Sequence, residues 1–323
     1  MTPLVSVIIS AYNSSGFIIE TLQSIKEQSY ENVELIITDD YSTDDTVEVC
    51  EKWIETNGDR FINAIVLKSD VNTGVSANAN RGLKQAKGDW VKLLGADDTL
   101  KIDCLKDNVH WVVTHPEVKV LLSRIEIYMD TFDKNNLIET TPGIPYSPEG
   151  ILGESRSAES QYKMLLVSDR IHFTPSIFFN TETVRKVGGF DERFRLLEDY
   201  PLWLNLTRAG FKIHFMEKIT VNYRRHKKAI NNTGINYLIN PNYFRSEEFR
   251  KIYTYQYLPL DLRCSARLFW LYSQLFRAEK NNKNTVWRKR VFSLLTFYLN
   301  PFTYVIWLRK RLIPSVRQSE FYI

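Results

Sequence analysis

Residues 88–98, GDWVKLLGADD, carry the pattern that best indicates the fold of this chain. Its apolar run, Trp90–Leu94, is typical of a buried strand and ends at Gly95, shortly before the adjacent carboxylates Asp97 and Asp98. Such a carboxylate pair suits Mg²⁺ or Mn²⁺, which prefer oxygen ligands and complete their shells with water and substrate phosphates. Asp is also a good helix cap, so the local sequence leaves both interpretations open.

Composition and charge narrow the class of protein. A chain of 323 residues can form one large domain with an appendage, or two domains. The net charge of +4 is modest, basic residues crowd the C-terminal third, and we expect no nucleic-acid partner. Cys50, Cys104 and Cys264 are far apart, which indicates a reducing compartment and argues against a zinc site. No signal peptide precedes the first strand, so we expect a cytoplasmic protein.

Strand and helix patterns alternate through the first hundred residues. Apolar runs at 4–9, 33–38, 61–67 and 90–94 are separated by helical patterns, which predicts an α/β fold with a mostly parallel sheet. Ligands bind such sheets at the carboxyl ends of the strands. The sequence has no glycine-rich dinucleotide or Walker loop, so a nucleotide held by carboxylates and a metal fits better. The polar residues at these strand ends are Ser10–Asn13, Asp39 and Asp40, Asn72–Gly74, and Asp97 and Asp98.

The middle of the chain predicts a second set of elements. Residues 130–160 are rich in Gly, Pro, Ser, Asp and Asn and are interpreted as a hairpin and mobile loops. A Glu-Asp pair, Glu198 and Asp199, precedes an amphipathic helix. The other predicted elements are a helix at 104–113, a strand at 118–129, a strand at 173–180, a helix at 184–190, and a closing strand pair at 212–215 and 219–223.

The C-terminal region, from about residue 229, predicts long helices rich in aromatic and basic residues. Residues 291–308 are almost wholly apolar, have basic triplets on both sides, and are broken at Asn300-Pro301. That length is near the lower limit for a membrane span, and the break with its basic flanks favours a helix pair at 286–313 lying on an anionic inner-membrane surface. The alternative is packing against the domain or against a second copy of the chain.

Six motifs together resemble the family 2 glycosyltransferases, in that family's order, over residues 4–228. The resemblance implies an α/β GT-A fold, with a mostly parallel nucleotide-binding sheet flanked by helices and a C-terminal helical extension. It implies a nucleotide-sugar half at 1–100, an acceptor half at 101–228 and a helical region at 229–323, in an enzyme of bacterial surface polysaccharide (O-antigen or capsule) synthesis. The motifs are VSVIISAYN (5–13), DDYSTDDT (39–46), NTGVSANANRGL (72–83), GADD (95–98), VGGFDERF (187–194) and LEDYPLWL (197–204).

The resemblance also implies roles for individual residues. Asp98 matches the metal carboxylate, Asp97 the ribose carboxylate and Asp199 the general base. His226 matches a residue that contacts the metal or the diphosphate. The residues expected to bind the uridine nucleotide are Ser10, Ala11, Tyr12, Asp40 and Asn72.

Two positions depart from the family pattern. Gly95 stands where the first acid of an Asp-x-Asp motif is usual, so the metal is expected to rest on Asp98. Ala79 stands where an Arg commonly precedes Asn80, which removes one expected donor.

The expected activity is inverting, metal-dependent transfer of a sugar from a UDP-sugar to a hydroxyl of a saccharide or lipid-linked acceptor. Mn²⁺ or Mg²⁺ would neutralise the leaving diphosphate, and Asp199 would deprotonate the acceptor. The alternatives are a sugar nucleotidyltransferase and a non-catalytic glycan-binding subunit.

Local alternatives remain for single residues. Asp199 could cap its helix, His226 could be a surface histidine, and Asp39 is expected to stabilise its turn. His172 is a further residue that could face the cleft.

Overall fold

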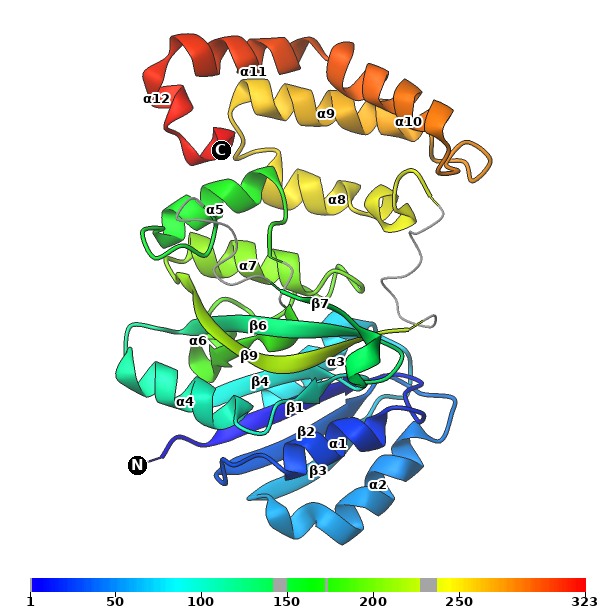
Figure 1. Ribbon diagram of the computed structural model, residues 1–323, viewed down its shortest axis with the longest axis vertical. Coiled ribbons are helices and arrows are strands. Elements are labelled where there is room, and N and C mark those ends of the chain that lie inside the picture. Colours follow the sequence, from blue (N-terminus) through cyan, green and yellow to red (C-terminus); the bar gives the residue numbers. More distant parts are fainter. Residues whose placement is uncertain (1, 142–149, 172–173, 227–236) are drawn as a thin grey trace. The chain divides into compact units, whose positions relative to one another are not determined.

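The computed structural model describes residues 2–141, 150–171, 174–226 and 237–323 (Figure 1). The chain forms two compact units. The first comprises Met1–Gln161 and Ile171–Arg225, and the second comprises Tyr162–Arg170 and His226–Ile323. His172 lies outside the described residues.

The first unit is built on one mixed sheet. Its strand order is β3-β2-β1-β4-β8-β6-β9-β5, with β7 paired to β6. β3, β2, β1 and β4 run parallel, β8 is antiparallel to both β4 and β6, and β9 is parallel to β6. The strands are β1 (Val5–Ala11), β2 (Val33–Asp39), β3 (Asn63–Lys68), β4 (Trp90–Gly95), β5 (Thr99–Leu100), β6 (Val120–Met129), β7 (Leu137–Thr140), β8 (Phe178–Asn180) and β9 (Ile213–Arg225).

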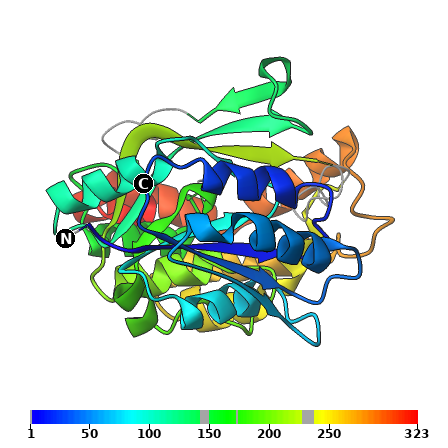
Figure 2. The ribbon, with the colours of Figure 1, turned by 90° about the horizontal axis from the view of Figure 1, so that it is seen from below.

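Helices cover both faces of this sheet (Figure 2). α1 shows why: Ile18, Leu22 and Ile25 recur at helical spacing and are fully buried against the sheet. The parallel strands beneath are predominantly apolar because both of their faces are covered. The helices of the first unit are α1 (Ile18–Lys26), α2 (Thr46–Asn57), α3 (Val75–Gln85), α4 (Cys104–Thr114), α6 (Thr181–Lys186) and α7 (Asp199–Arg208). The helix α5 (Ala158–Val167) begins in the first unit and continues into the second.

The mostly parallel α/β fold and the C-terminal helical extension are confirmed, with local corrections. The predicted closing strand pair is wrong, because Ile213–Arg225 is one long strand, β9. Its pairing with β6 shifts register around Arg124, which lets a single strand continue through the polar interruption at Glu217 and Lys218. The predicted strand at 173–180 is shorter, because the 3-10 turn Thr174–Ser176 precedes β8.

The second unit is helical over its described C-terminal part. Its elements are α8 (Glu247–Phe249), α9 (Leu260–Gln274), α10 (Val286–Ser293), the π-helical turn η7 (Leu294–Tyr298), α11 (Pro301–Leu312) and α12 (Pro314–Arg317). Within the described residues, no single helix has the length and hydropathy to cross a membrane. Val286–Tyr298 and Pro301–Leu312 meet that criterion only jointly, as a pair bent by 53°.

Candidate active site

The carboxyl ends of three neighbouring strands form one edge of the sheet. In the parallel registers, Ala11 of β1 pairs with Asp39 of β2, and Ser10 of β1 pairs with Gly95 of β4. The Asp40 backbone N–H donates to the Ala11 carbonyl at 3.0 Å, which holds the first residue beyond β2 against the end of β1. The acidic residues that follow β2 and β4 therefore flank the end of β1, as the rule for parallel sheets predicts.

Asp97 and Asp98 form a carboxylate pair at this edge. Asp98 is 3% exposed, and its Oδ1 accepts the backbone N–H of Arg224 at 2.8 Å. Burial, together with the negative charge of Asp97, raises the pKa of Asp98 well above its ordinary value. A buried acid with a second, half-buried acid next to it is stabilised by a divalent cation, and oxygen ligands are those that Mg²⁺ and Mn²⁺ prefer. The donor set therefore fits such an ion.

Gly95 explains how the pair fits together. A Cβ at this position would lie 2.8 Å from Asp97 Oδ1 and 3.4 Å from Asp98 Oδ2. The Asp97 carboxylate thus occupies space that a side chain at position 95 would fill. The site holds two acids in this chain, and among the described residues no three His, Cys, Asp or Glu side chains gather into a metal cluster. Mg²⁺ commonly needs only one or two carboxylates when substrate phosphates supply further oxygens.

Arg224 is a functional candidate that the sequence did not single out. It is 2% exposed, and its Nε donates to the Asp97 carbonyl at 2.8 Å while its guanidinium also contacts the Glu20 carboxylate and the Asp130 carbonyl. The guanidinium lies 4.0 Å from the centre of the Phe132 ring. Arg224 therefore fixes the backbone of one acid with its side chain and the carboxylate of the next with its backbone. The density of donors in residues 223–228 was the only signal in the sequence.

Asp40 is buried and holds a turn. Its carboxylate accepts Thr73 N–H at 2.9 Å, Thr73 Oγ1 at 2.5 Å and Gly74 N–H at 2.6 Å, and Arg81 lies 3.8 Å away. With three hydrogen bonds accepted, little capacity is left for a ligand. Contact between Asp40 and a base remains a prediction, and its observed hydrogen bonds hold the turn at Thr73 and Gly74 that precedes α3.

Other residues at the edge have distinct environments. Ala11 is 1% exposed, so its side chain lines no open surface, whereas Tyr12 is 48% exposed. Ser10 Oγ is buried without a hydrogen-bond partner in the described parts of the chain. Asn72 contacts the Asp40 carbonyl through Nδ2 at 3.1 Å. The expected structural role of Asp39 is confirmed, because its carboxylate accepts both the N–H and the hydroxyl of Ser42 at 2.8 and 2.5 Å.

Two of the sequence motifs interlock at this edge. The Asn72 Oδ1 atom accepts Arg195 Nη2 at 2.7 Å, and the Asn80 side chain exchanges hydrogen bonds with the backbone of Phe190 at 2.8 and 2.9 Å. Arg81 supplies a guanidinium next to Asp40, although Ala79 removes the donor expected two residues earlier. The NTGVSANANRGL and VGGFDERF segments are thus one structural element made from distant parts of the chain.

Asp199 begins α7 rather than capping it. Its Oδ2 accepts the Thr174 hydroxyl at 2.7 Å, and its Oδ1 accepts the Tyr200 N–H at 2.7 Å. β8 pairs antiparallel with β4 through Lys92 and Phe178, so the turn containing Thr174 runs toward the carboxyl end of β4. Asp199 is therefore held on the side of the sheet edge that carries Asp98.

Glu198, the residue before Asp199, has a raised pKa. Burial, with the Asp199 charge as the second cause, raises the pKa of Glu198 to about 7. His226 directly follows β9 and is buried at 8% exposure. Its proposed metal contact remains a prediction.

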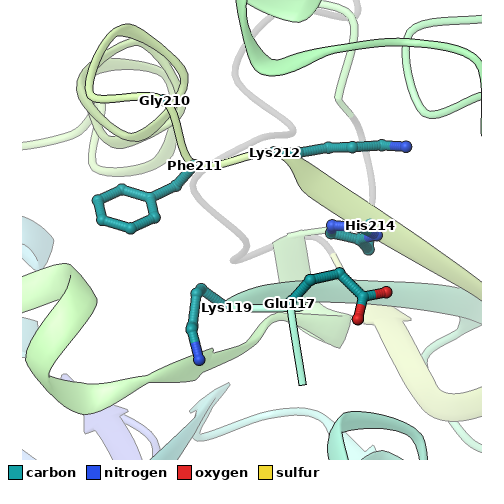
Figure 3. A pocket seen from close by; sticks show the side chains of 6 residues that line it. All are labelled: Glu117, Lys119, Gly210, Phe211, Lys212 and His214. Carbon is teal, nitrogen blue, oxygen red and sulfur yellow. The ribbon is translucent and has the colours of Figure 1, made fainter. Parts of the chain in front are cut away.

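A pocket lined by two lysines and a histidine lies at the other edge of the sheet (Figure 3). Its lining residues precede or begin β6 and β9, so it is separated from the carboxylate pair by the length of the strands. Burial, aided by the charge of Lys212, lowers the pKa of His214 there to about 4. This pocket holds none of the predicted site residues. It is lined by Glu117, Lys119, Gly210, Phe211, Lys212 and His214.

Comparison with known proteins decides the family. Residues 6–177, more than half of the chain, match the family described as Glycosyl transferase family 2. The chain belongs to this family. It is a glycosyltransferase, as the motifs predicted.

Relatives and solved structures agree with this assignment. The chain is 29% identical over 227 residues to the Escherichia coli UDP-Glc:alpha-D-GlcNAc-diphosphoundecaprenol beta-1,3-glucosyltransferase WfaP, covering 70% of this chain and 79% of WfaP. The fold matches S. aureus TarS 1-349 in complex with UDP-GlcNAc, with a TM-score of 0.58, 19% identity, and coverage of 99% and 89%. It also matches the Pyrobaculum calidifontis mannosyltransferase PcManGT in complex with GDP-Man and Mn²⁺, with a TM-score of 0.53, 18% identity, and coverage of 98% and 78%. The GT-A fold is confirmed.

Proposed function

We propose that this glycosyltransferase moves a sugar from a UDP-sugar to a hydroxyl of a lipid-linked saccharide, with inversion and with a divalent metal. The observation that carries the proposal is the carboxylate pair of half-buried Asp97 and buried Asp98, at the same sheet edge toward which the turn holding Asp199 runs. UDP is favoured because the relative WfaP is named for UDP-Glc, and its diphosphoundecaprenol acceptor supports a lipid-linked acceptor here.

Asp98 is the residue that would hold Mn²⁺ or Mg²⁺, with His226 as a further contact, while Asp97 next to it would bind the ribose of the nucleotide. A bound metal would act as a Lewis acid on the diphosphate and fix its position. The Mn²⁺ complex of PcManGT supports metal dependence, and the raised pKa of Asp98 supports a site that gains from a cation. Gly95 supports it further, since it leaves room for both carboxylates.

Asp199 is the proposed general base. Each of its oxygens accepts one hydrogen bond, from Thr174 or from Tyr200, and an ionised carboxylate retains further lone pairs for the proton of the acceptor hydroxyl. The raised pKa of Glu198, about 7, lessens the negative charge next to Asp199 at neutral pH. A single displacement by the deprotonated hydroxyl inverts the anomeric carbon.

The donor nucleotide is proposed to contact Ser10, Tyr12 and Asn72, with Ala11 and Asp40 shaping the edge behind them. Residues 1–100 would bind the donor and 101–228 the acceptor, while 229–323 would form a separate helical region. A role in bacterial surface polysaccharide synthesis on the cytoplasmic face of the membrane follows from the lipid-linked acceptor.

The test is turnover of UDP- and GDP-sugars with lipid-diphosphate-linked saccharides, with Mn²⁺, with Mg²⁺ and with EDTA. Asp199→Asn should lower kcat by about 10²–10⁴-fold while UDP binding, measured by calorimetry, is kept. Asp98→Asn should weaken metal-dependent UDP binding. Asp59→Asn, an exposed acid away from the site, is the matched control and should change neither. Turnover that persists in Asp199→Asn or in EDTA would contradict these roles, and NMR of the product checks inversion.

A further inference from the structure

The exposed face of α11 is apolar, whereas the exposed face of a surface helix in a soluble protein is normally polar. Tyr304, Leu308 and Leu312 follow one another at four-residue spacing and are 53%, 48% and 67% exposed. Trp307, beside this stripe, is 56% exposed. The side of α11 that is less exposed carries Arg309, which is paired with the buried Asp261 of α9 at 2.6 Å. The helix therefore packs a salt bridge inward and presents its apolar stripe outward.

α10 and η7 continue the same exposed surface. Trp287, Leu294, Phe297 and Tyr298 are 73%, 48%, 56% and 58% exposed. Figure 1 shows α10 and α11 following one another along α9, on its side away from α8. Exposed apolar groups in this number on consecutive helices indicate an interaction surface. We call this surface, formed by residues 286–313, the C-terminal apolar face.

Contacts with α9 hold the bend between the two helices. Asn300 is 1% exposed, donates to Ser265 Oγ at 2.9 Å and caps α11 by accepting the Phe302 N–H at 3.1 Å. The Tyr272 hydroxyl donates to the Leu299 carbonyl at 3.3 Å. Straightening the 53° bend into one span would break these contacts with α9 and leave a buried Asn unpaired. The pair is therefore built to lie along a surface rather than to cross a bilayer.

The charged side chains of this region are all basic. Between Glu279 and Glu320 the sequence has nine Lys and Arg residues and no acid. Lys289 and Arg290 are exposed and have no side-chain partner in the part of the chain that the structure describes. The Arg311 guanidinium lies over Trp307, 5.4 Å from the ring centre. Basic side chains beside exposed tryptophans match the head-group region of an anionic membrane.

We propose that the C-terminal apolar face docks in the plane of an anionic membrane surface, with its aromatic and leucine side chains among the lipid chains and Lys289, Arg290 and Arg311 on the phosphates. A second copy of the chain is a poorer partner, because a symmetric dimer would bring a face with only positive charge against itself. The inference goes beyond the proposed transfer reaction and needs no substrate for its test.

The first experiment measures co-sedimentation of the full chain with vesicles of phosphatidylcholine alone or mixed with phosphatidylglycerol. Binding is expected only to the mixed vesicles and is expected to fall at high salt. Lys289→Glu/Arg290→Glu and, separately, Trp307→Asp/Leu308→Asp should each weaken binding by at least about tenfold. The matched controls are Lys84→Glu/Lys134→Glu and Ile62→Asp/Ile138→Asp, on exposed positions of the first unit, and should bind as the natural chain does.

A second experiment separates docking in the plane from spanning and from dimerisation. Lipids brominated near the head group should quench tryptophan fluorescence more than lipids brominated deep in the chain, and Trp287→Phe/Trp307→Phe should abolish that quenching. Light scattering in the absence of lipid should give the same mass for the natural chain and for Trp307→Asp/Leu308→Asp. Equal binding by the face variants, deep quenching, or a mass that halves in the variant would each overturn the proposal.

Discussion

At the scale of single residues, the site is shaped by side chains that would not touch the sugar. Gly95 leaves the space that Asp97 Oδ1 occupies, since a Cβ would lie 2.8 Å away. Arg224 ties the backbone of Asp97 and the carboxylate of Asp98 into one arrangement. The buried Lys92 holds the turn that carries Thr174. Its Nζ donates to the Pro175 carbonyl at 2.9 Å, and Thr174, the preceding residue, binds Asp199.

Lys92 gives a prediction about pH. Its side chain is fully buried, and burial lowers its pKa from 10.5 to about 8. Between these values the unfolded chain binds the proton and the folded chain does not, so the free energy of unfolding should rise with pH, by about 3 kcal/mol in total. Urea unfolding from pH 7.5 to 10.5 should show this rise in the natural chain relative to Lys92→Met.

The control for this series is Lys84→Met, which removes an exposed lysine and should give a pH curve parallel to that of the natural chain. If Lys92→Met also ran parallel to it, Lys92 would titrate at its ordinary pKa and the prediction would be wrong.

At the scale of elements, the strands that build the site were predictable and their partners were not. β1, β2 and β4 are predominantly apolar runs followed by polar residues, and this local pattern suffices to place them. β9 was predicted as two strands, because its polar interruption looks like a turn when the β6 partner is unknown. The contact between α3 and the 187–195 segment depends on Gly74, which has a φ of +93° and lies against Arg195. Neither feature can be read from the local sequence.

Gly74→Ala should destabilise the protein by about 3 kcal/mol. The new Cβ would lie 2.7 Å from both the Cβ and the carbonyl oxygen of Arg195, in addition to the backbone strain at positive φ. Gly188 has the same φ of +93° with no atom within 4 Å of its Cβ position, so Gly188→Ala should cost only about 1 kcal/mol. Urea denaturation of both variants measures the difference, and equal costs would show that the Arg195 contact gives way.

At the scale of the whole molecule, the chain consists of two compact units, each with its own buried residues. In the second unit, the Tyr322 hydroxyl lies 2.8 Å from the carboxylate of Asp261, which also pairs with Arg309. The end of the chain is thereby attached to α9. Contacts of this kind stabilise only the unit in which they occur, because units with separate cores can open separately.

Tyr322→Phe should lower the stability of the second unit by about 1–2 kcal/mol, because Asp261 is 5% exposed and loses one hydrogen bond. Hydrogen exchange should quicken in residues 260–312 and stay unchanged in β1, β2 and β4. Tyr304→Phe, which removes an exposed hydroxyl that donates to the Tyr298 carbonyl, is the control and should change exchange little. Faster exchange throughout the sheet would show that the two units unfold together.

The sequence by itself determined the α/β class, the acidic strand ends and the family, because buried parallel strands and their terminal turns are local patterns of few residues. Only the tertiary structure decided which groups meet. Arg224 reaches Asp98 across 126 positions, and Thr174 holds Asp199 through a turn placed by β8. The outward direction of the α11 apolar stripe was likewise undecided, because helical spacing defines a stripe but not the side on which α9 packs.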